Sequence, residues 1–222
     1  MVAQRVTGDS YGGYRTRLVE QLQAKGIKDL AVLKAIATVP RHLFVPEAVR
    51  HRAYEDSALP LGAGQTVSQP WVQARSLELL RLSGGERVLE IGAGSGYQTA
   101  LLGCLSSAVF AVERIPALAY LAREALALAG ISNVSVLVGD GTLGWSSTAP
   151  YDAIVVAAAS PTIPQPLIRQ LAPGGRLVIP VGEGGVQSLR VLERRGDGLV
   201  ETHVADVRFV PLIGRHGVPE FG

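Results

Sequence analysis

The 222-residue sequence predicts an α/β fold with a doubly wound, mostly parallel seven-stranded sheet and an N-terminal helical extension. Three observations support this prediction. A glycine-rich turn joins a short apolar strand to a helix within residues 87–98. After this turn, apolar strands alternate with helices, which is the pattern of a parallel sheet covered on both faces. Before it, two segments have the apolar spacing of amphipathic helices.

The N-terminal extension is predicted to contain two helices. Residues 1–12 show no periodicity, so we expect this end of the chain to be frayed. Asp29 is placed to cap the second helix. Residues 40–46 carry proline at both ends, which predicts an extended connector. The apolar positions of each helix fall on one face: Leu18, Val19 and Leu22 in the first, and Leu30, Leu33 and Ile36 in the second.

A long loop over residues 54–70 precedes a helix predicted over 71–82. Loops of this length inside a compact domain are uncommon and tend to be functional. Pro70 suits the first turn of the helix, and Ser68 stands where a helix cap is expected. Capping alone would explain this serine, but it would not explain the long loop before it.

The glycine-rich turn predicts a nucleotide-type ligand site. Glycine adopts backbone conformations closed to other residues and lets a ligand approach the N–H groups at a helix start. A dinucleotide fingerprint would place its third glycine at position 97, which is tyrosine here. The glycines instead alternate at 92, 94 and 96, and Glu90 lies inside the preceding strand. The spacing therefore argues against a dinucleotide cofactor.

Acidic residues follow the next two strands. The strand 108–112 ends at Glu113, about twenty residues after the first glycine, where nucleotide sites place a carboxylate for the ribose hydroxyls. Asp140 follows the next strand and would meet the adenine edge, with an ordinary turn residue as the alternative. Gly92, Glu113 and Asp140 all lie at carboxyl ends of predicted parallel strands, so they should converge on one site. The other predicted strands are 134–138, 152–157, 175–181, 187–195 and 199–210, the last two joined by a turn at 195–198.

The composition excludes several classes of protein. Hydrophobic residues make up 47% and charged residues 18%, which describes a compact globular chain. The net charge is +2 and basic residues such as Arg41, Arg50 and Arg52 are scattered, so we expect a solvated surface and no nucleic-acid partner. No apolar run approaches the roughly 20 residues of a membrane span and no signal-peptide core is seen, which predicts a cytoplasmic protein without a membrane partner. Cys104 is the only cysteine, and we interpret it as a small buried hydrophobe.

The alternating pattern from Glu90 to Gly96 resembles motif I of the Rossmann-like S-adenosylmethionine (SAM) methyltransferases. After the fourth strand, residues 157–161 read Ala-Ala-Ala-Ser-Pro instead of the Asn/Asp-Pro-Pro-Tyr of amino-methylating enzymes. Cysteine is also absent where a pyrimidine C5 methyltransferase needs its nucleophile. An acceptor that requires no activation fits best, and a carboxylate, ionised at neutral pH, is such a group.

Further motifs resemble the protein-L-isoaspartate O-methyltransferase family over roughly residues 39–214. The most specific is the loop 58–70 with its Gly-Gln-Thr-Val-Ser-Gln-Pro run, and the others lie at 89–97, 139–141, 151–153, 171–182 and 207–212. The resemblance implies a protein repair methyltransferase, which transfers the methyl group of SAM to the free α-carboxylate of L-isoaspartyl residues in damaged proteins and peptides. The ester then collapses to a succinimide that partly reopens as normal aspartate.

The resemblance also implies roles for individual residues. Ser68 would be the active-site serine, and Val210 to Ile213 would close over the peptide, although the family often has a polar residue at 213. Residues 1–83 would supply helices and the active-site loop, packed on a SAM-binding core at 84–222, and the family reverses the usual order of the last two strands. The implied cofactor contacts are Thr66, Val67, Gln73, Gly92, Gly94, Glu113, Asp140 and Gly141.

Two other classes of function stay open. A SAM methyltransferase acting on a small molecule or RNA would leave the 66–70 segment unexplained. A regulatory protein that binds SAM would show no turnover. For the enzyme we expect a monomer without metal, with isoaspartyl proteins and peptides as partners.

Overall fold

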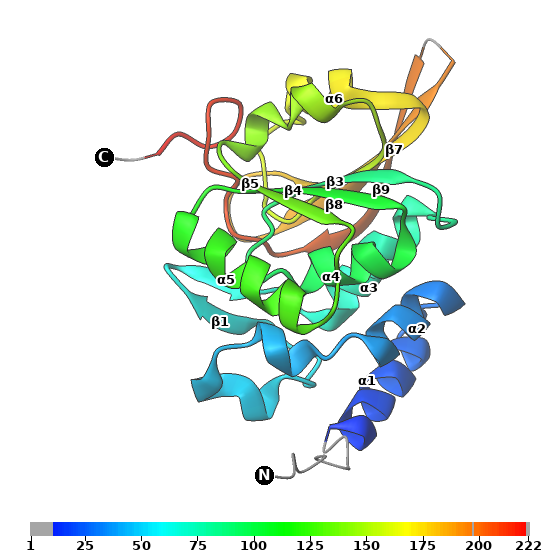
Figure 1. Ribbon diagram of the computed structural model, residues 1–222. Helices are drawn as coiled ribbons and strands as arrows, with labels where there is room; N and C mark the ends of the chain where they lie inside the picture. Colours follow the sequence, from blue (N-terminus) through cyan, green and yellow to red (C-terminus); the bar gives the residue numbers. More distant parts are fainter. Residues whose placement is uncertain (1–10, 197, 221–222) are drawn as a thin grey trace.

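The computed structural model describes residues 11–196 and 198–220 of the chain. A seven-stranded sheet forms the centre, with α3, α4 and α5 beneath it and α6 above it in the view of Figure 1. The predicted α/β fold with its helical extension is confirmed. The helices are α1 (Gly12–Ala24), α2 (Leu30–Thr38), α3 (Pro70–Leu80), α4 (Tyr97–Leu105), α5 (Pro116–Leu128) and α6 (Gln165–Gln170), and the short 3₁₀ helices are η1 (Arg41–Phe44), η2 (Glu47–Arg52), η3 (Gly141–Leu143) and η4 (Ser146–Thr148).

The sheet has the strand order β5-β4-β3-β6-β7-β8-β9. Its first five strands are parallel neighbours, whereas β8 pairs antiparallel with both β7 and β9. The strands are β3 (Arg87–Ile91), β4 (Ala108–Glu113), β5 (Val134–Val138), β6 (Tyr151–Val156), β7 (Leu171–Val181), β8 (Gln187–Arg195) and β9 (Gly198–Val207).

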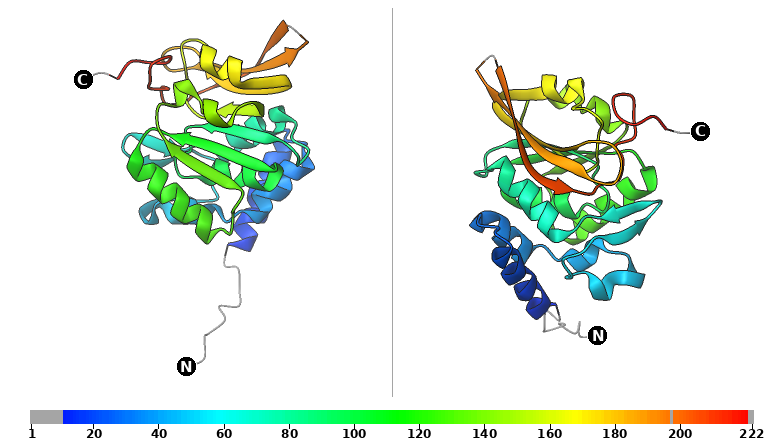
Figure 2. Two further views of the ribbon diagram at one scale, coloured as in Figure 1. Left: turned by 45° about the horizontal axis from the view of Figure 1, so that its top comes forward. Right: turned by 180° about the vertical axis from the view of Figure 1, so that it is seen from behind.

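The two reversals at β8 and β9 have a consequence for the site. They make β9 run in the same direction as β3, so Val207 ends at the edge of the sheet that carries Gly92 and Glu113. The chain then crosses back, because Ala159 N–H donates to Val210 O and Leu212 N–H donates to Ala159 O. Figure 2 shows the hairpin of β8 and β9 projecting beyond the other strands. At this side of the sheet the strands lie in their order along the chain, β7-β8-β9. This is the reversed order of the last two strands that the family resemblance implies.

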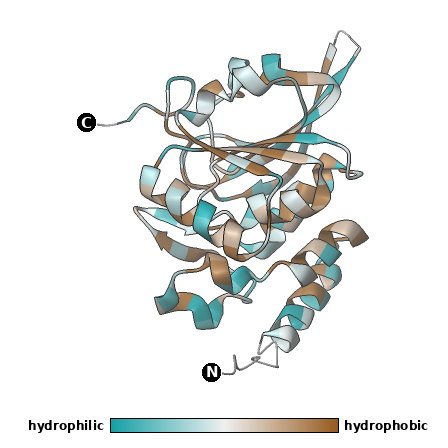
Figure 3. Ribbon diagram, in the orientation of Figure 1, coloured by the Kyte–Doolittle hydropathy of each residue, from teal (hydrophilic) through white to brown (hydrophobic). Residues whose placement is uncertain are grey.

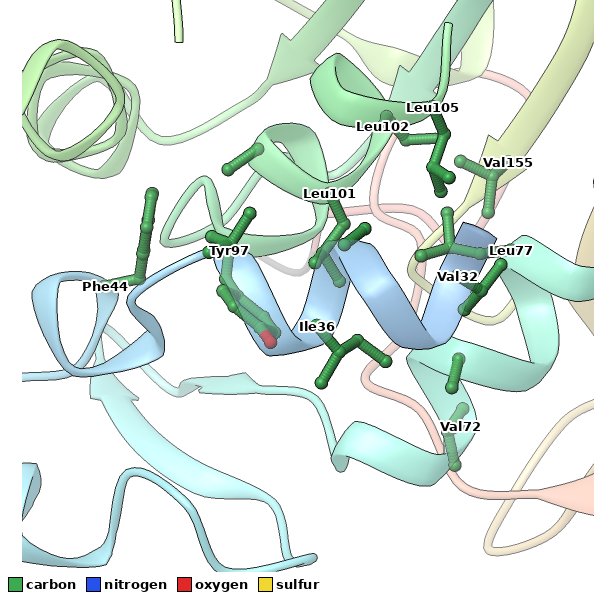
Figure 4. Packing of buried hydrophobic residues seen from close by; sticks show 14 of the residues in the cluster. Val32, Ile36, Phe44, Val72, Leu77, Tyr97, Leu101, Leu102, Leu105 and Val155 are labelled. Atoms are coloured by element: carbon green, nitrogen blue, oxygen red, sulfur yellow. The ribbon is translucent and has the colours of Figure 1, made fainter. Parts of the chain in front are cut away.

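Successive side chains of the parallel strands point to opposite faces of the sheet, where they belong to two buried apolar clusters. Val88 belongs to the cluster under α2, α3 and α4, and its neighbour Leu89 belongs to the cluster on the opposite face. Figure 3 shows hydrophobic residues along the strands of the sheet and hydrophilic ones on η2. Figure 4 shows Val32 of α2 beside Leu77 of α3. Burial of such side chains contributes about 1.5–3 kcal/mol each, which anchors the helical extension on the core.

Three sequence predictions in the helical extension can be compared with the structure. Asp29 caps α2, since its side chain accepts hydrogen bonds from Ala31 N–H and Val32 N–H. The prediction of an extended connector at 40–46 is wrong, because Leu43 N–H donates to Pro40 O and closes the turn of η1. The frayed end expected for residues 1–12 lies largely outside the described residues, and α1 already includes residue 12.

The long segment at 54–70 is more ordered than a loop. It contains a two-stranded antiparallel hairpin of β1 (Leu59–Gly62) and β2 (Gln65–Val67). Gly62, Ala63 and Gly64 turn the chain with positive φ angles of 102°, 50° and 70°. Strands of three and four residues are too short to show a periodic pattern in the sequence, so the hairpin was not predicted.

Two predictions about the burial of single residues are also wrong. Arg41 is fully buried instead of solvated. Cys104 is exposed, because α4 buries the face that carries Leu101, Leu102 and Leu105 and turns the cysteine outward. The turn predicted at 195–198 includes residue 197, which lies outside the described residues.

Candidate active site

A cavity of about 590 Å³ lies at the carboxyl ends of the parallel strands. This volume is within the range of about 300–1,000 Å³ typical of small-molecule and cofactor sites. The hairpin β1–β2, the start of α3, the glycine-rich turn and the segment after β9 all contribute to its wall. The predicted site residues that line it are Thr66, Val67, Ser68, Gln73, Gly92, Glu113, Gly141, Val210 and Ile213.

The glycine-rich turn is built from left-handed backbone. Gly92, Gly94 and Gly96 have φ angles of 86°, 54° and 84°, which disfavour any side chain. A Cβ at Gly96 would lie 3.1 Å from the Ala122 side chain, so this glycine lets α5 approach the turn. Gly94 does not line the cavity, but its N–H donates to the carboxylate of Glu113 at 2.8 Å.

The Glu113 carboxylate is held firmly at the cavity wall. One oxygen accepts from Gly94 N–H, and the other accepts from Ile115 N–H at 2.9 Å. The residue is 6% exposed. Each carboxylate oxygen has a second lone pair, so both oxygens can still accept a hydroxyl from a ligand. The geometry therefore suits the ribose role that the sequence predicts.

Asp140 has a different environment from the one expected. Its carboxylate accepts hydrogen bonds from Thr142 N–H, the Thr142 hydroxyl and Arg215 N–H, and it lines a smaller neighbouring cavity. Burial raises the pKa of this carboxyl, but these hydrogen bonds outweigh the burial and hold the pKa below its ordinary value. Asp140 is not one of the described residues that line the main cavity, whereas Gly141 is. An adenine contact by Asp140 stays a prediction.

Ser68 lies at the end of the hairpin, in the wall of the cavity. The N-cap of α3 is Gln69, whose side chain makes no cap hydrogen bond, and the Trp71 N–H in the first turn donates to the Asp56 carboxylate and not to Ser68. The alternative of Ser68 as a helix cap is therefore not supported. Val210 and Ile213 approach from the segment after β9, which the Ala159 hydrogen bonds fix in place.

Sequence reasoning missed two groups near the site. Arg41 donates to the Ser68 carbonyl oxygen and to the Gln73 side chain, each at 2.9 Å. Arg208 and Phe209 line the cavity beside Val210. The basic residues carried no periodic signal in the sequence, and only the tertiary fold shows which of them is buried.

Glu90 lies behind the glycine-rich turn and is fully buried. Burial raises its pKa to about 8, although hydrogen bonds from Thr99 and Gln98 oppose the increase. Gln98 lines the cavity, so Glu90 contacts a residue of the site through this hydrogen bond. Glu90 thus holds the first turn of α4, which follows the glycine-rich turn.

Comparisons with known proteins agree with this architecture. The sequence profile described as protein-L-isoaspartate(D-aspartate) O-methyltransferase (PCMT) matches residues 14–217. A relative from Syntrophobacter fumaroxidans named protein-L-isoaspartate O-methyltransferase 1 is 51% identical over 204 residues, which cover 91% of this chain and 95% of the relative. A relative from Methanoculleus marisnigri named protein-L-isoaspartate O-methyltransferase is 55% identical over 205 residues, which cover 91% and 93%.

The chain belongs to the protein-L-isoaspartate O-methyltransferase family. It is therefore an enzyme of the methyltransferase class, and the predicted family is confirmed. Small-molecule and RNA methylation, which the sequence left open, are the less supported functions, since the profile and these relatives all carry the isoaspartate name.

A solved structure of this family also bears on the cofactor. The Plasmodium falciparum structure described as a beta-aspartate methyltransferase (PCMT) contains S-adenosyl-L-homocysteine. It superposes with a TM-score of 0.79 at 26% identity and covers 90% of this chain and 98% of its own. SAM is thus supported as the cofactor of this family member.

The residues present fit SAM. The Gly92 backbone lines the cavity without a side chain, and the Glu113 carboxylate can accept two hydroxyls beside it. Within residues 11–196 and 198–220, no cluster of His, Cys, Asp and Glu could hold a metal ion. In the same part of the chain, no helix has the length and apolarity needed to cross a membrane.

Proposed function

We propose that this protein methylates the free α-carboxylate of L-isoaspartyl residues in proteins and peptides, and that Ser68 holds this carboxylate. The observation that supports the proposal is the position of Ser68 in one cavity with the glycine-rich turn and the segment after β9. When bound, SAM supplies a methyl group on a sulfonium, which an ionised carboxylate can accept without a general base.

The cofactor contacts are assigned to two groups of residues. Gly92 and Glu113 are proposed to hold the nucleoside, with Gly94 fixing the Glu113 carboxylate from behind. Asp140 and Gly141 are proposed for the adenine, with only the glycine in the cavity wall. Gln73 is proposed for the amino-acid end of the cofactor, and Thr66 and Val67 are proposed to lie in the loop around cofactor and substrate.

The acceptor contacts are proposed to involve main chain as well as Ser68. In isoaspartate the chain runs through the side-chain carbonyl, so the α-carboxylate stays free on a shorter arm. The segment at Val210 to Ile213 is extended and could pair with the flanking peptide as an added strand does. A normal aspartyl peptide would place its carboxylate one methylene out of line, and a displacement of about 1 Å can cost about a hundredfold in rate.

The decisive experiment measures transfer of a radiolabelled methyl group from SAM to paired isoaspartyl and aspartyl peptides of otherwise identical sequence. We expect at least about a hundredfold preference for the isoaspartyl peptide. Varied side chains around the isoaspartyl residue should be tolerated, because recognition is through main chain. Equal methylation of both peptides would contradict the proposed selection.

Isoaspartyl polypeptides are the macromolecular partners of this activity. We propose that the enzyme acts as a monomer without a membrane partner, and its net charge of only +2 supports the absence of a nucleic-acid partner. The division at residue 83 and the cytoplasmic location stay predictions. Size-exclusion chromatography with light scattering tests this proposal, since a monomer has a mass near 23.4 kDa.

A further inference from the structure

Arg41 is a buried cation behind the active site. The residue is 0% exposed and lies in η1, directly after Pro40. Its guanidinium donates to two neutral acceptors, the Gln73 side-chain oxygen and the Ser68 main-chain oxygen, each at 2.9 Å. Its Cζ lies 4.6 Å from the centre of the Tyr97 ring.

Stability alone does not account for this arrangement. Removing a charge from water costs several kcal/mol, and apolar side chains of similar volume often serve equally well in a core. The two hydrogen bonds and the ring contact of Arg41, however, are with elements that form the site. Ser68 ends the hairpin, Gln73 is in the first turn of α3, and Tyr97 begins α4 directly after the glycine-rich turn. One cation thus connects the acceptor loop with the cofactor turn.

The contact with Arg41 fixes the orientation of the Gln73 amide. A guanidinium has only donors, so the amide oxygen of Gln73 must face Arg41. Gln73 lines the cavity and is 5% exposed. Its NH₂ group is therefore the part available to a ligand, and this group can only donate. A carboxylate in the cavity is the chemical group that such a donor suits.

The same guanidinium holds the Ser68 peptide group from behind. A hydrogen bond from a charged donor is stronger than one between neutral groups. Because Arg41 does not line the cavity but holds the Ser68 carbonyl, it fixes the loop that places Ser68 in the wall of the cavity. Loss of the guanidinium would free both the loop and the amide.

We propose that Arg41 is a positioning residue of the methyl-transfer site, which fixes the Ser68 loop and orients the Gln73 NH₂ toward a ligand carboxylate. The proposal rests on the proposed function, because that function places the amino-acid end of the cofactor beside Gln73. Arg41 itself does not contact the reacting atoms.

The test compares two ligands that share a nucleoside. S-adenosylhomocysteine carries an amino-acid carboxylate, and 5′-methylthioadenosine lacks it. Calorimetry with Arg41→Met should show at least about tenfold weaker binding of S-adenosylhomocysteine, the effect of one hydrogen bond to a charged group, with little change for 5′-methylthioadenosine. In the ligand-free protein, hydrogen exchange at residues 65–69 should become faster. Arg41→Lys, which keeps the charge but reaches only one acceptor, should lie between Arg41→Met and the unmodified protein.

Gln73→Glu separates positioning from stability. Glutamate would keep the contact with Arg41 as an ion pair, but it would present an acceptor to the cavity instead of a donor. The melting temperature should be retained, whereas binding of S-adenosylhomocysteine should fall at least about tenfold. The matched control is Arg194→Met, because Arg194 also donates to a main-chain oxygen, that of Ile168, but away from the cavity.

Each outcome decides the inference. Unchanged S-adenosylhomocysteine affinity and turnover in a folded Arg41→Met protein would overturn it. If Arg41→Met does not fold, unchanged affinity in Gln73→Glu would overturn it equally. If the unmodified protein fails to bind S-adenosylhomocysteine, the proposed function itself is wrong, and this result is distinct from a failure of the Arg41 variants alone.

Discussion

The two ends of the cavity are built in different ways. At the cofactor end, a strand, a glycine turn and Glu113 come from a single stretch of about thirty residues, like the βαβ units of nucleotide-binding folds. At the acceptor end, Ser68, Ala159 and Val210 come from three distant parts of the sequence. The cofactor end can form from one local unit, whereas the acceptor end is brought together only by the complete sheet.

The difference teaches how each end should respond to mutation. The Glu113 carboxylate has two main-chain donors that hold it, so it behaves as a rigid part of the turn. The Ser68 carbonyl is instead held by the long side chain of Arg41, which comes from a distant part of the sequence. We therefore expect substitutions at the acceptor end to affect turnover first, and substitutions at the cofactor end to affect binding first.

The largest effect is expected for Ser68→Ala. Loss of the hydroxyl should lower methyl transfer to an isoaspartyl peptide about a hundredfold or more, since the acceptor carboxylate is no longer aligned. The melting temperature should change little, because the structure has no cap hydrogen bond from this residue to lose. Ser57→Ala, just before the same hairpin, is the control for turnover. If activity simply follows the folded fraction, Ser68 has only a structural role.

Glu113→Ala tests the cofactor end. Calorimetry should show binding of S-adenosylhomocysteine weakened by about 1.5–3 kcal/mol, the usual value for a hydrogen bond to a charged group. Glu124→Ala on the exposed face of α5, where the carboxylate only accepts from Tyr120, should leave the affinity unchanged. Equal affinity in the Glu113 and Glu124 variants would show that Glu113 does not bind the ribose hydroxyls.

Asp140→Ala separates a structural role of this carboxylate from a direct contact with adenine. Thr142 and Arg215 would lose their acceptor, so the free energy of unfolding should fall by about 1–3 kcal/mol. Thermal denaturation measures this loss, and calorimetry measures affinity. Affinity should fall less than in Glu113→Ala, because the carboxylate lies outside the main cavity. A larger loss of affinity than of stability would instead favour a direct adenine contact.

The smallest effect on methyl transfer is expected for Glu90, whose contribution is to stability and depends on pH. Its pKa is raised to about 8 in the folded protein, above the ordinary value of 4.5, so the folded state binds the extra proton. This contribution to stability is fully present below pH 4.5 and is lost progressively as the pH rises toward 8, because the unfolded state loses its proton first. Glu90→Gln resembles the protonated acid and should flatten this slope. A denaturation series from pH 5 to 8 with an unchanged slope would contradict it.

The sequence predicted what is local. The glycine turn, the Asp29 cap and the alternation of strands and helices depend on spacing within a few residues, and the structure contains all three. The hairpin β1–β2 was missed because its strands are too short to show a period. The burial of Arg41 depends on contacts with Ser68, Gln73 and Tyr97, which lie far from it in the sequence, so no local pattern could show it.

Because β9 follows the other strands in the sequence, the two walls of the cavity form at different times during synthesis. A ribosome releases the glycine-rich turn and the Ser68 hairpin well before the segment at Val210 to Ile213, which pairs with Ala159. The wall for the nucleoside can therefore form while the wall for the damaged peptide is still being synthesised. We expect a chain that has been synthesised only as far as residue 209 to be unable to methylate a peptide, because the pairing of Val210 and Leu212 with Ala159 has not yet formed.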